Sequence, residues 1–188
     1  MIEDPAGMIE SLVTASKSRQ SLMEAASLLD QFSREDVDAA ITYVLTHGDH
    51  SAYHLLFALR RRAEDAYDRL PPEVKVNILR DALKHLHYLN DWGYLDPKGS
   101  HDGEAAQALL KLGHDALQPL VLLIDDGRPV RLFGSEAATI ARMYQYRTRD
   151  FAYRYLYLIL GRQPVFDPDP QVRDAEIERL KTELQREK

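Results

Sequence analysis

Apolar residues recur at helical spacing along most of the chain. The clearest case is the segment 37–45, in which the apolar positions i, i+3, i+4, i+7 and i+8 are Val37, Ala40, Ile41, Val44 and Leu45. Residues at these intervals lie on one face of an α-helix, so this stripe needs a packing partner. Because no sustained run alternates with a period of two, β-sheet is not expected. The pattern predicts an all-α fold.

The ends of this helix can be read from its flanking residues. Ser33 and Asp36 have the spacing of a capping box, in which a hydroxyl and a carboxylate satisfy amide groups of the first turn. Gly48 follows the last apolar position and can adopt the left-handed conformation that ends many helices. We therefore expect a helix over 33–47.

Similar patterns predict nine further helices, which makes about ten in all. They span about 7–16, 19–31, 50–68 with a break near Arg62, 72–89, 103–112, 115–125, 135–147, 149–160 and 170–186. Turn-forming residues dominate only 90–100, where Trp92 is expected to hold the loop in place. We expect one domain over 1–188, with a junction between two half-stacks at 90–102.

The segment 104–126 has the pattern of two closely packed helices. An alanine-rich stretch ends in Leu112-Gly113, and a leucine-rich stretch follows and ends at Asp125-Asp126. Small alanines allow two helices to approach closely, and leucines fill the space between them. Gly113 is suited to the tight turn that joins them.

This pattern, continued by Val130-Arg131, resembles a HEAT-like repeat, and the clear match covers 104–131. The segments 134–139 and 146–152 also look like parts of bacterial HEAT-like proteins. The resemblance implies an α-α superhelix of stacked helical hairpins, an architecture that exposes a long surface for binding macromolecules. The N-terminal half lacks the leucine-glycine turn, so the number of repeats stays open.

Composition excludes several classes of chemistry. The chain has 188 residues, enough for one sizeable core, and contains no cysteine, which rules out disulfides and thiolate metal sites. The N-terminus lacks the pattern of a secretion signal and no window is apolar enough to span a membrane, so we expect a cytoplasmic protein. No phosphate loop, dinucleotide fingerprint or nucleophile elbow is found, and we expect neither catalytic residues nor a cofactor.

Charge is distributed unevenly. Residues 1–50 hold nine acidic and three basic residues, whereas the rest of the chain holds 21 of each. An acidic N-terminal quarter argues against nucleic-acid binding through that part, because phosphate contacts need clustered Lys and Arg. It suits either a basic protein partner or an ordinary solvated surface.

The segment 142–157 is the best candidate for a binding surface. It holds five of the ten tyrosines and four arginines against one acid, and both residue types dominate interface hot spots. Tyr153 and Tyr157 share a helix face, while Tyr155 faces the core; alternatively, most of the tyrosines pack inside. The predicted partner-binding residues, with the adjoining glutamate, are Glu136, Arg142, Tyr146, Arg147, Arg149, Tyr153, Arg154 and Tyr157.

Two pairs of histidines have spacings that bear on metal binding. His50 and His54 stand at i and i+4 and could hold one metal, but no Glu follows His50, so the zinc-protease pattern is absent. His85 and His87 are two residues apart and point to different faces. We expect no metal.

Three functions follow from the sequence. The first is a non-enzymatic protein-binding or adaptor module that uses the Tyr/Arg segment. The second is a helical-repeat nucleic-acid binder, including base repair, in which the same arginines contact phosphates. The third is an inhibitor or immunity-type protein that covers a basic partner with Glu35, Asp36 and Asp38.

Overall fold

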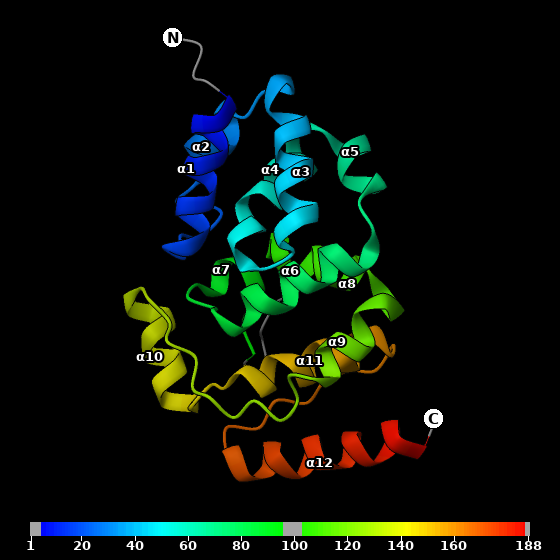
Figure 1. The fold of residues 1–188 in the computed structure, drawn as a ribbon. Helices are drawn as coiled ribbons and strands as arrows, with labels where there is room; N and C mark the ends of the chain where they lie inside the picture. The colour runs from blue at the N-terminus through cyan, green and yellow to red at the C-terminus, as the bar shows by residue number, and fades with distance from the viewer. Residues whose placement is uncertain (1–4, 96–102, 187–188) are drawn as a thin grey trace. The chain divides into compact units, whose positions relative to one another are not determined.

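A computed structural model describes residues 5–95 and 103–186, and all regular structure in them is helical (Figure 1). The chain divides into two compact units between His85 and Leu86. This boundary lies before the predicted junction at 90–102, of which residues 96–102 lie outside the described ranges. The described residues form twelve α-helices. The two additional helices arise from the break near Arg62 and from one helical turn inside the predicted loop.

Unit 1 contains six α-helices and two short 3-10 turns. They are α1 (Pro5–Lys17), α2 (Ala26–Gln31), η1 (Arg34–Asp36), α3 (Val37–His47), η2 (His50–Ala52), α4 (Tyr53–Arg62), α5 (Glu64–Arg69) and α6 (Pro72–Lys84). Helix α4 is central and packs against all five other helices. Every residue from Tyr53 to Leu59 is buried, as expected for a helix that is apolar on all sides.

The local signals around α3 are confirmed. The backbone N–H and the hydroxyl of Ser33 donate to Asp36 Oδ2 at 2.7 and 2.8 Å, and the Ser33 hydroxyl accepts from the N–H of Glu35 at 3.2 Å. Gly48 has a φ of 58°, and its N–H donates to the carbonyl of Val44, which ends the helix. The predicted break near Arg62 is also present, because α4 ends there and α5 begins at Glu64.

Two predicted helices of unit 1 are shorter than expected. Ser21 and Glu24 exchange side-chain and backbone hydrogen bonds at 2.9 and 3.1 Å, so the chain turns and α2 begins only at Ala26. Helix α6 ends at Lys84 instead of residue 89. There His85 Nδ1 lies 2.9 Å from the carbonyl oxygen of Asp81. The imidazole thus occupies the acceptor that the backbone N–H of residue 85 would use if the helix continued.

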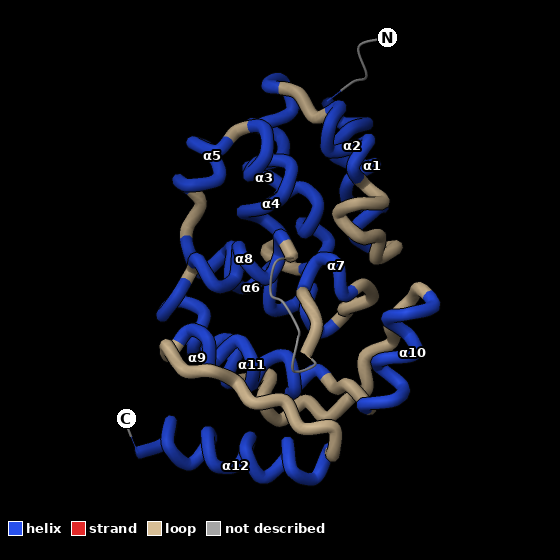
Figure 2. The backbone as a smooth tube through the Cα atoms, turned by 180° about the vertical axis from the view of Figure 1, so that it is seen from behind, coloured by secondary structure: helices blue, strands red, loops and turns tan. Residues whose placement is uncertain are grey.

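Unit 2 contains the remaining helices. They are α7 (Leu89–Trp92), α8 (Glu104–Lys111), η3 (Gly113–Ala116), α9 (Leu117–Val121), α10 (Ser135–Tyr144), α11 (Thr148–Ile159) and α12 (Pro170–Arg186). Helix α11 is central and packs against α8, α9 and α12. Figure 2 shows the connection from α9 to α10 running beside α11 without helical structure.

Two buried contacts fix the outer elements of unit 2 to α11. The Tyr155 hydroxyl donates to the main-chain carbonyl of Trp92, whose buried ring has its centroid 6.3 Å from that of Tyr155. The expectation that Trp92 holds the whole loop stays a prediction. Arg173 of α12 is buried and its guanidinium donates to both carboxylate oxygens of Asp150. It also donates to the carbonyls of Tyr144, Gln145, Asp167 and Pro168.

Candidate functional site

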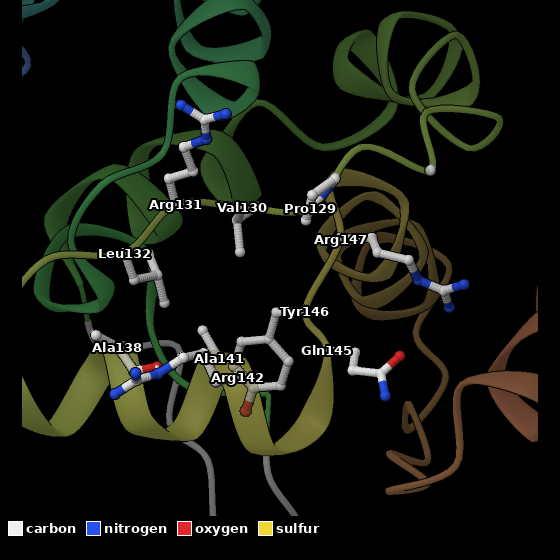
Figure 3. Close-up of a pocket in the computed structure, with 11 residues that line it drawn as sticks. Pro129, Val130, Arg131, Leu132, Ala138, Ala141, Arg142, Gln145, Tyr146 and Arg147 are labelled. Carbon is white, nitrogen blue, oxygen red and sulfur yellow. Dashed lines mark hydrogen bonds between the residues drawn. The ribbon is translucent and has the colours of Figure 1, made fainter.

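A cleft of about 740 Å³ lies in unit 2 between α10 and the extended segment 127–132 (Figure 3). The residues that line it are Gly127, Pro129, Val130, Arg131, Leu132, Ala138, Ala141, Arg142, Gln145, Tyr146 and Arg147. This size falls within the range of natural ligand sites. The cleft is therefore a candidate binding site in unit 2.

Backbone hydrogen bonds hold the extended wall of the cleft. The Val130 N–H donates to the carbonyl of Tyr146 at 3.0 Å, and the Thr148 N–H donates to the carbonyl of Arg128 at 3.1 Å. An isolated antiparallel bridge joins Pro129 to Arg147 between them. The wall thus lies against the α10–α11 connection like a strand beside its partner, although it forms no strand.

The interior of the cleft is apolar. Successive side chains of an extended chain point to opposite sides, and Figure 3 shows Val130 directed into the opening while the Arg131 guanidinium points away from it. On the opposite wall, α10 presents Ala138 and Ala141, whose short side chains leave the space open. An apolar side chain of a ligand would find contact surface on both walls.

The charged residues that line the cleft are all arginines. Arg131 and Arg142 are exposed, and neither forms an ion pair with a residue in the described part of the chain. Arg147 differs, because its guanidinium lies 2.8 Å from both Asp150 and Asp174. Burial would lower the pKa of Arg147, but the hydrogen bonds that its guanidinium donates to these two carboxylates outweigh this effect and raise the pKa. The border of the cleft therefore carries positive charge that its lining does not neutralise.

The eight residues predicted as one partner surface are not equally accessible. Glu136 and Arg142 are exposed, and Arg147, Arg149 and Tyr157 are half-buried. Tyr146, Tyr153 and Arg154 are only 1%, 7% and 9% exposed, so their assignment to a surface is corrected. The physical reason is that Tyr153 and Arg154 lie on α11, the central helix of unit 2, which is covered by its neighbours. Tyr146 lies just before α11, with its ring against those of Phe151 and Phe166. The alternative that most of these tyrosines pack inside describes the segment better.

Helix α12 covers part of the Tyr/Arg segment. Arg149 forms an ion pair with Asp174 at 2.8 Å, and the rings of Tyr153 and Tyr157 lie 4.5 Å apart on the same helix face, as predicted. Burial, with a further contribution from the hydrogen bond to Tyr157, raises the pKa of Tyr153. Of the eight residues, only Arg142, Tyr146 and Arg147 line the cleft.

Sequence reasoning missed the rest of the cleft. Val130 and Leu132 were visible as alternating apolar positions after the turn-forming residues Gly127 and Pro129, but such a short run is a weak signal. The segment 134–139, which contains Ala138 of α10, carries only the resemblance to HEAT-like proteins. Only the folded chain places the two segments opposite each other.

The paired-histidine hypothesis is wrong for His54. This residue is fully buried in α4, where its Nδ1 lies 2.9 Å from the hydroxyl of Ser16 and its Nε2 lies 3.5 Å from the carbonyl of Ser21. Burial lowers the pKa of His54 to about 4, so the imidazole is neutral at pH 7. A core hydrogen-bond role accounts for it.

The acidic residues near η1 also need a revised account. The carboxylate of Asp36 is buried and capped by Ser33, so it is not free to contact a basic partner. Glu35 and Asp38 are exposed. The test of an acidic interface by neutralising all three residues would therefore also remove a helix cap.

The chain matches no known protein family, and no curated protein or solved structure shows significant similarity to it. The resemblance to HEAT-like repeats accordingly stays a prediction. Within the described ranges, no helix has the length and apolar character needed to cross a lipid bilayer.

Proposed function

We propose that this chain is a non-enzymatic binding module whose cleft in unit 2 holds a segment of a partner protein. The segment carries an apolar side chain flanked by carboxylates. The observation that carries the proposal is the combination of an apolar interior with a lining whose charged residues are all arginines. Such a site complements acidic-apolar peptides in both contact surface and charge.

The apolar part of the proposal is supported by the two walls of the cleft. Val130 and Leu132 come from a wall fixed by backbone hydrogen bonds, and Ala138 and Ala141 come from a helix. Because both supports exist before binding, a ligand would not have to order them, which reduces the entropic cost of association.

The charged part is supported by Arg131 and Arg142. Their guanidinium groups are exposed and have no carboxylate partner among the described residues. The Nε of Arg142 donates to the carbonyl of Ala138 at 3.2 Å, so its terminal nitrogens would bind an incoming carboxylate. Arginine can bind a carboxylate through two parallel hydrogen bonds, which adds orientation to attraction.

We further propose that α8 and α9 form one HEAT-like unit. In support, Ala105, Ala106 and Ala108 of α8 are buried, and Gly113 between the helices has a φ of 54°. A repeat architecture suits a protein that binds macromolecules through an extended surface.

Selection of peptides from a random library displayed on phage tests the binding function. The full-length protein should enrich peptides that combine an aliphatic or aromatic residue with Asp or Glu. Ala138→Trp should abolish their binding by filling the cleft, and the double variant R131E/R142E should weaken it at least about tenfold. Affinities are measured by fluorescence polarisation of the enriched peptides.

The matched control is the double variant K111E/R186E, which makes the same change of charge at two exposed residues of unit 2 outside the cleft. It should bind as the wild type does. Enrichment of no peptide, or equal affinity for the wild type and Ala138→Trp, would refute the proposal.

Nucleic-acid binding remains an alternative from the sequence, but it would need exposed tyrosines on which bases could stack. Tyr146 and Tyr153 are buried, so the segment offers few exposed aromatic rings. A labelled single strand titrated at low salt tests this alternative. Binding that weakens steeply with added salt and is lost in R131E/R142E would favour nucleic acid over a peptide ligand.

A further inference from the structure

A second group of chemically capable side chains lies in unit 1, apart from the cleft. Asp81 and His85 stand one helical turn apart on and just after α6, so they share a face. His50 opens η2, which packs against α6. Asp49 fixes the start of η2, because its carboxylate accepts from the N–H of Ser51 at 2.8 Å. Residues 31 positions apart in the sequence are thereby brought together.

The three side chains form a tight cluster. His50 Nδ1 lies 2.8 Å from Asp81 Oδ2, and the N–H of His50 donates to the same oxygen at 3.1 Å. The rings of His50 and His85 have centroids 4.2 Å apart. One ligand atom from each of the three residues lies within 4.8 Å of the other two. All three are half-buried, so a solvated ion can reach them.

The hydrogen bond of His85 prepares its other nitrogen for a metal. Its Nδ1 lies 2.9 Å from the carbonyl oxygen of Asp81, and since a carbonyl only accepts, Nδ1 carries the proton. In the neutral ring Nε2 then holds a free electron pair. A histidine that donates one N–H to a backbone carbonyl and coordinates through the other nitrogen is typical of metal sites.

We propose that His50, Asp81 and His85 bind a divalent first-row transition metal, with zinc as the representative ion. Two ligands at the usual zinc distance of about 2.1 Å are separated by about 3.0–3.4 Å, close to the spacing of His50 and Asp81. The ion takes the place of the proton that bridges these two residues, and that proton passes to solvent. His85 completes the set by side-chain rotation.

Two imidazoles and one carboxylate leave at least one coordination position for water. This donor set suits zinc and its neighbours rather than calcium or magnesium, which prefer oxygen ligands. Lys84 Nζ lies 3.4 Å from the other oxygen of Asp81, and its positive charge opposes that of the ion. Removing that charge should therefore strengthen metal binding.

Calorimetric titration of the full-length chain with zinc chloride tests the proposal, using protein without a histidine tag at pH 7.5. One ion should bind per chain, and cobalt(II) in the same site should give visible absorption bands from nitrogen and oxygen ligands. His85→Gln should lower the affinity at least about tenfold, whereas Lys84→Gln should raise it about fivefold. His114→Gln, at an exposed histidine of unit 2, is the matched control and should leave the affinity unchanged.

Thermal unfolding with and without zinc gives a second readout. Zinc should raise the Tm of the wild type but not that of His85→Gln, because an ion that binds only the folded chain stabilises it. His85→Gln is preferred to a change at Asp81, whose carboxylate also holds the backbone of η2. Absence of one-to-one binding, or equal affinity in wild type and His85→Gln, would show that the cluster is a hydrogen-bonded clip and overturn the proposal.

Discussion

The central helices of the two units bury polar side chains in different ways. In α4 the buried ionisable residue His54 is neutral and bonded to Ser16 and Ser21. In α11 the buried carboxylate of Asp150 is charged and lies between the guanidinium groups of Arg147 and Arg173. A neutral group needs only a hydrogen-bond partner, whereas a buried charge needs a counter-charge, and Arg147 and Arg173 supply it here. The stability of unit 2 should therefore depend on charge pairing more than that of unit 1.

The largest expected effect is that of Arg173→Ala. The substitution leaves Asp150 with one guanidinium fewer and removes the donor to four backbone carbonyls. We expect the free energy of unfolding to fall by about 3–5 kcal/mol, as when one partner of a buried pair is lost. Urea denaturation measures this free energy of unfolding. In the variant, the backbone amides of α12 should exchange hydrogen faster than those of α1.

Arg179→Ala provides the control for this change. Arg179 lies on the same helix, but its side chain is largely exposed, and its ion pair within the described residues is with Glu176 at 3.0 Å. Such a pair contributes less than about 1 kcal/mol. Equal losses for the two substitutions would mean that α12 is held by its apolar contacts and that the buried charge has no special role.

The next effect concerns pH and unit 1. Because the pKa of His54 falls from 6.5 to about 4 on folding, the unfolded chain binds more protons between these values. Stability should therefore fall as the pH is lowered from 7 to 4, by about 3 kcal/mol from this residue. Burial also lowers the pKa of His85, with the same sign, and that contribution remains in a His54 variant.

His54→Gln isolates the effect, since glutamine has no charge to gain. The free energy of unfolding, measured in urea at several pH values, should decline less steeply for the variant than for the wild type. If the free energy of unfolding declined equally with pH in both proteins, protonation of His54 would cost no folding free energy. That result would be inconsistent with its buried position in α4.

The smallest expected effect is that of Asp36→Ala, which removes a buried carboxylate capped by the neutral donors of Ser33. We expect a loss of about 1 kcal/mol, the usual value of an N-terminal cap, measured by thermal unfolding. Asp150→Ala, at the corresponding position of α11, should cost several times more because it leaves two arginines without their shared partner. Similar losses would remove the distinction between the two units.

Local signals made much of the fold predictable. The cap at Ser33, the left-handed Gly48 and the break near Arg62 each depend on residues within about one helical turn, so the sequence contains the information directly. The all-helical class followed from the spacing of apolar residues. The last helix was also placed correctly at 170–186.

The candidate sites were harder to predict because they depend on distant contacts. Tyr and Arg have apolar stems and polar tips, so their pattern does not reveal whether a helix is covered, and α11 is covered by a helix that begins at Pro170. His50 meets Asp81 only because η2 packs on α6. One wall of the cleft is neither helix nor strand, and the spacing of apolar residues does not predict the path of such an irregular segment.

The wall of the cleft is held by hydrogen bonds of its main chain, and the side chains of Val130 and Arg131 take no part in them. Its hydrogen bonds run from Val130 to Tyr146, from Thr148 to Arg128 and from Phe133 to His87, and none of them involves a side chain of the wall. Val130 and Arg131 can therefore be exchanged without disturbing these hydrogen bonds, whereas Leu132 is buried in the core. If the cleft binds a peptide as proposed, selection at these two positions would change the ligand while leaving the scaffold intact.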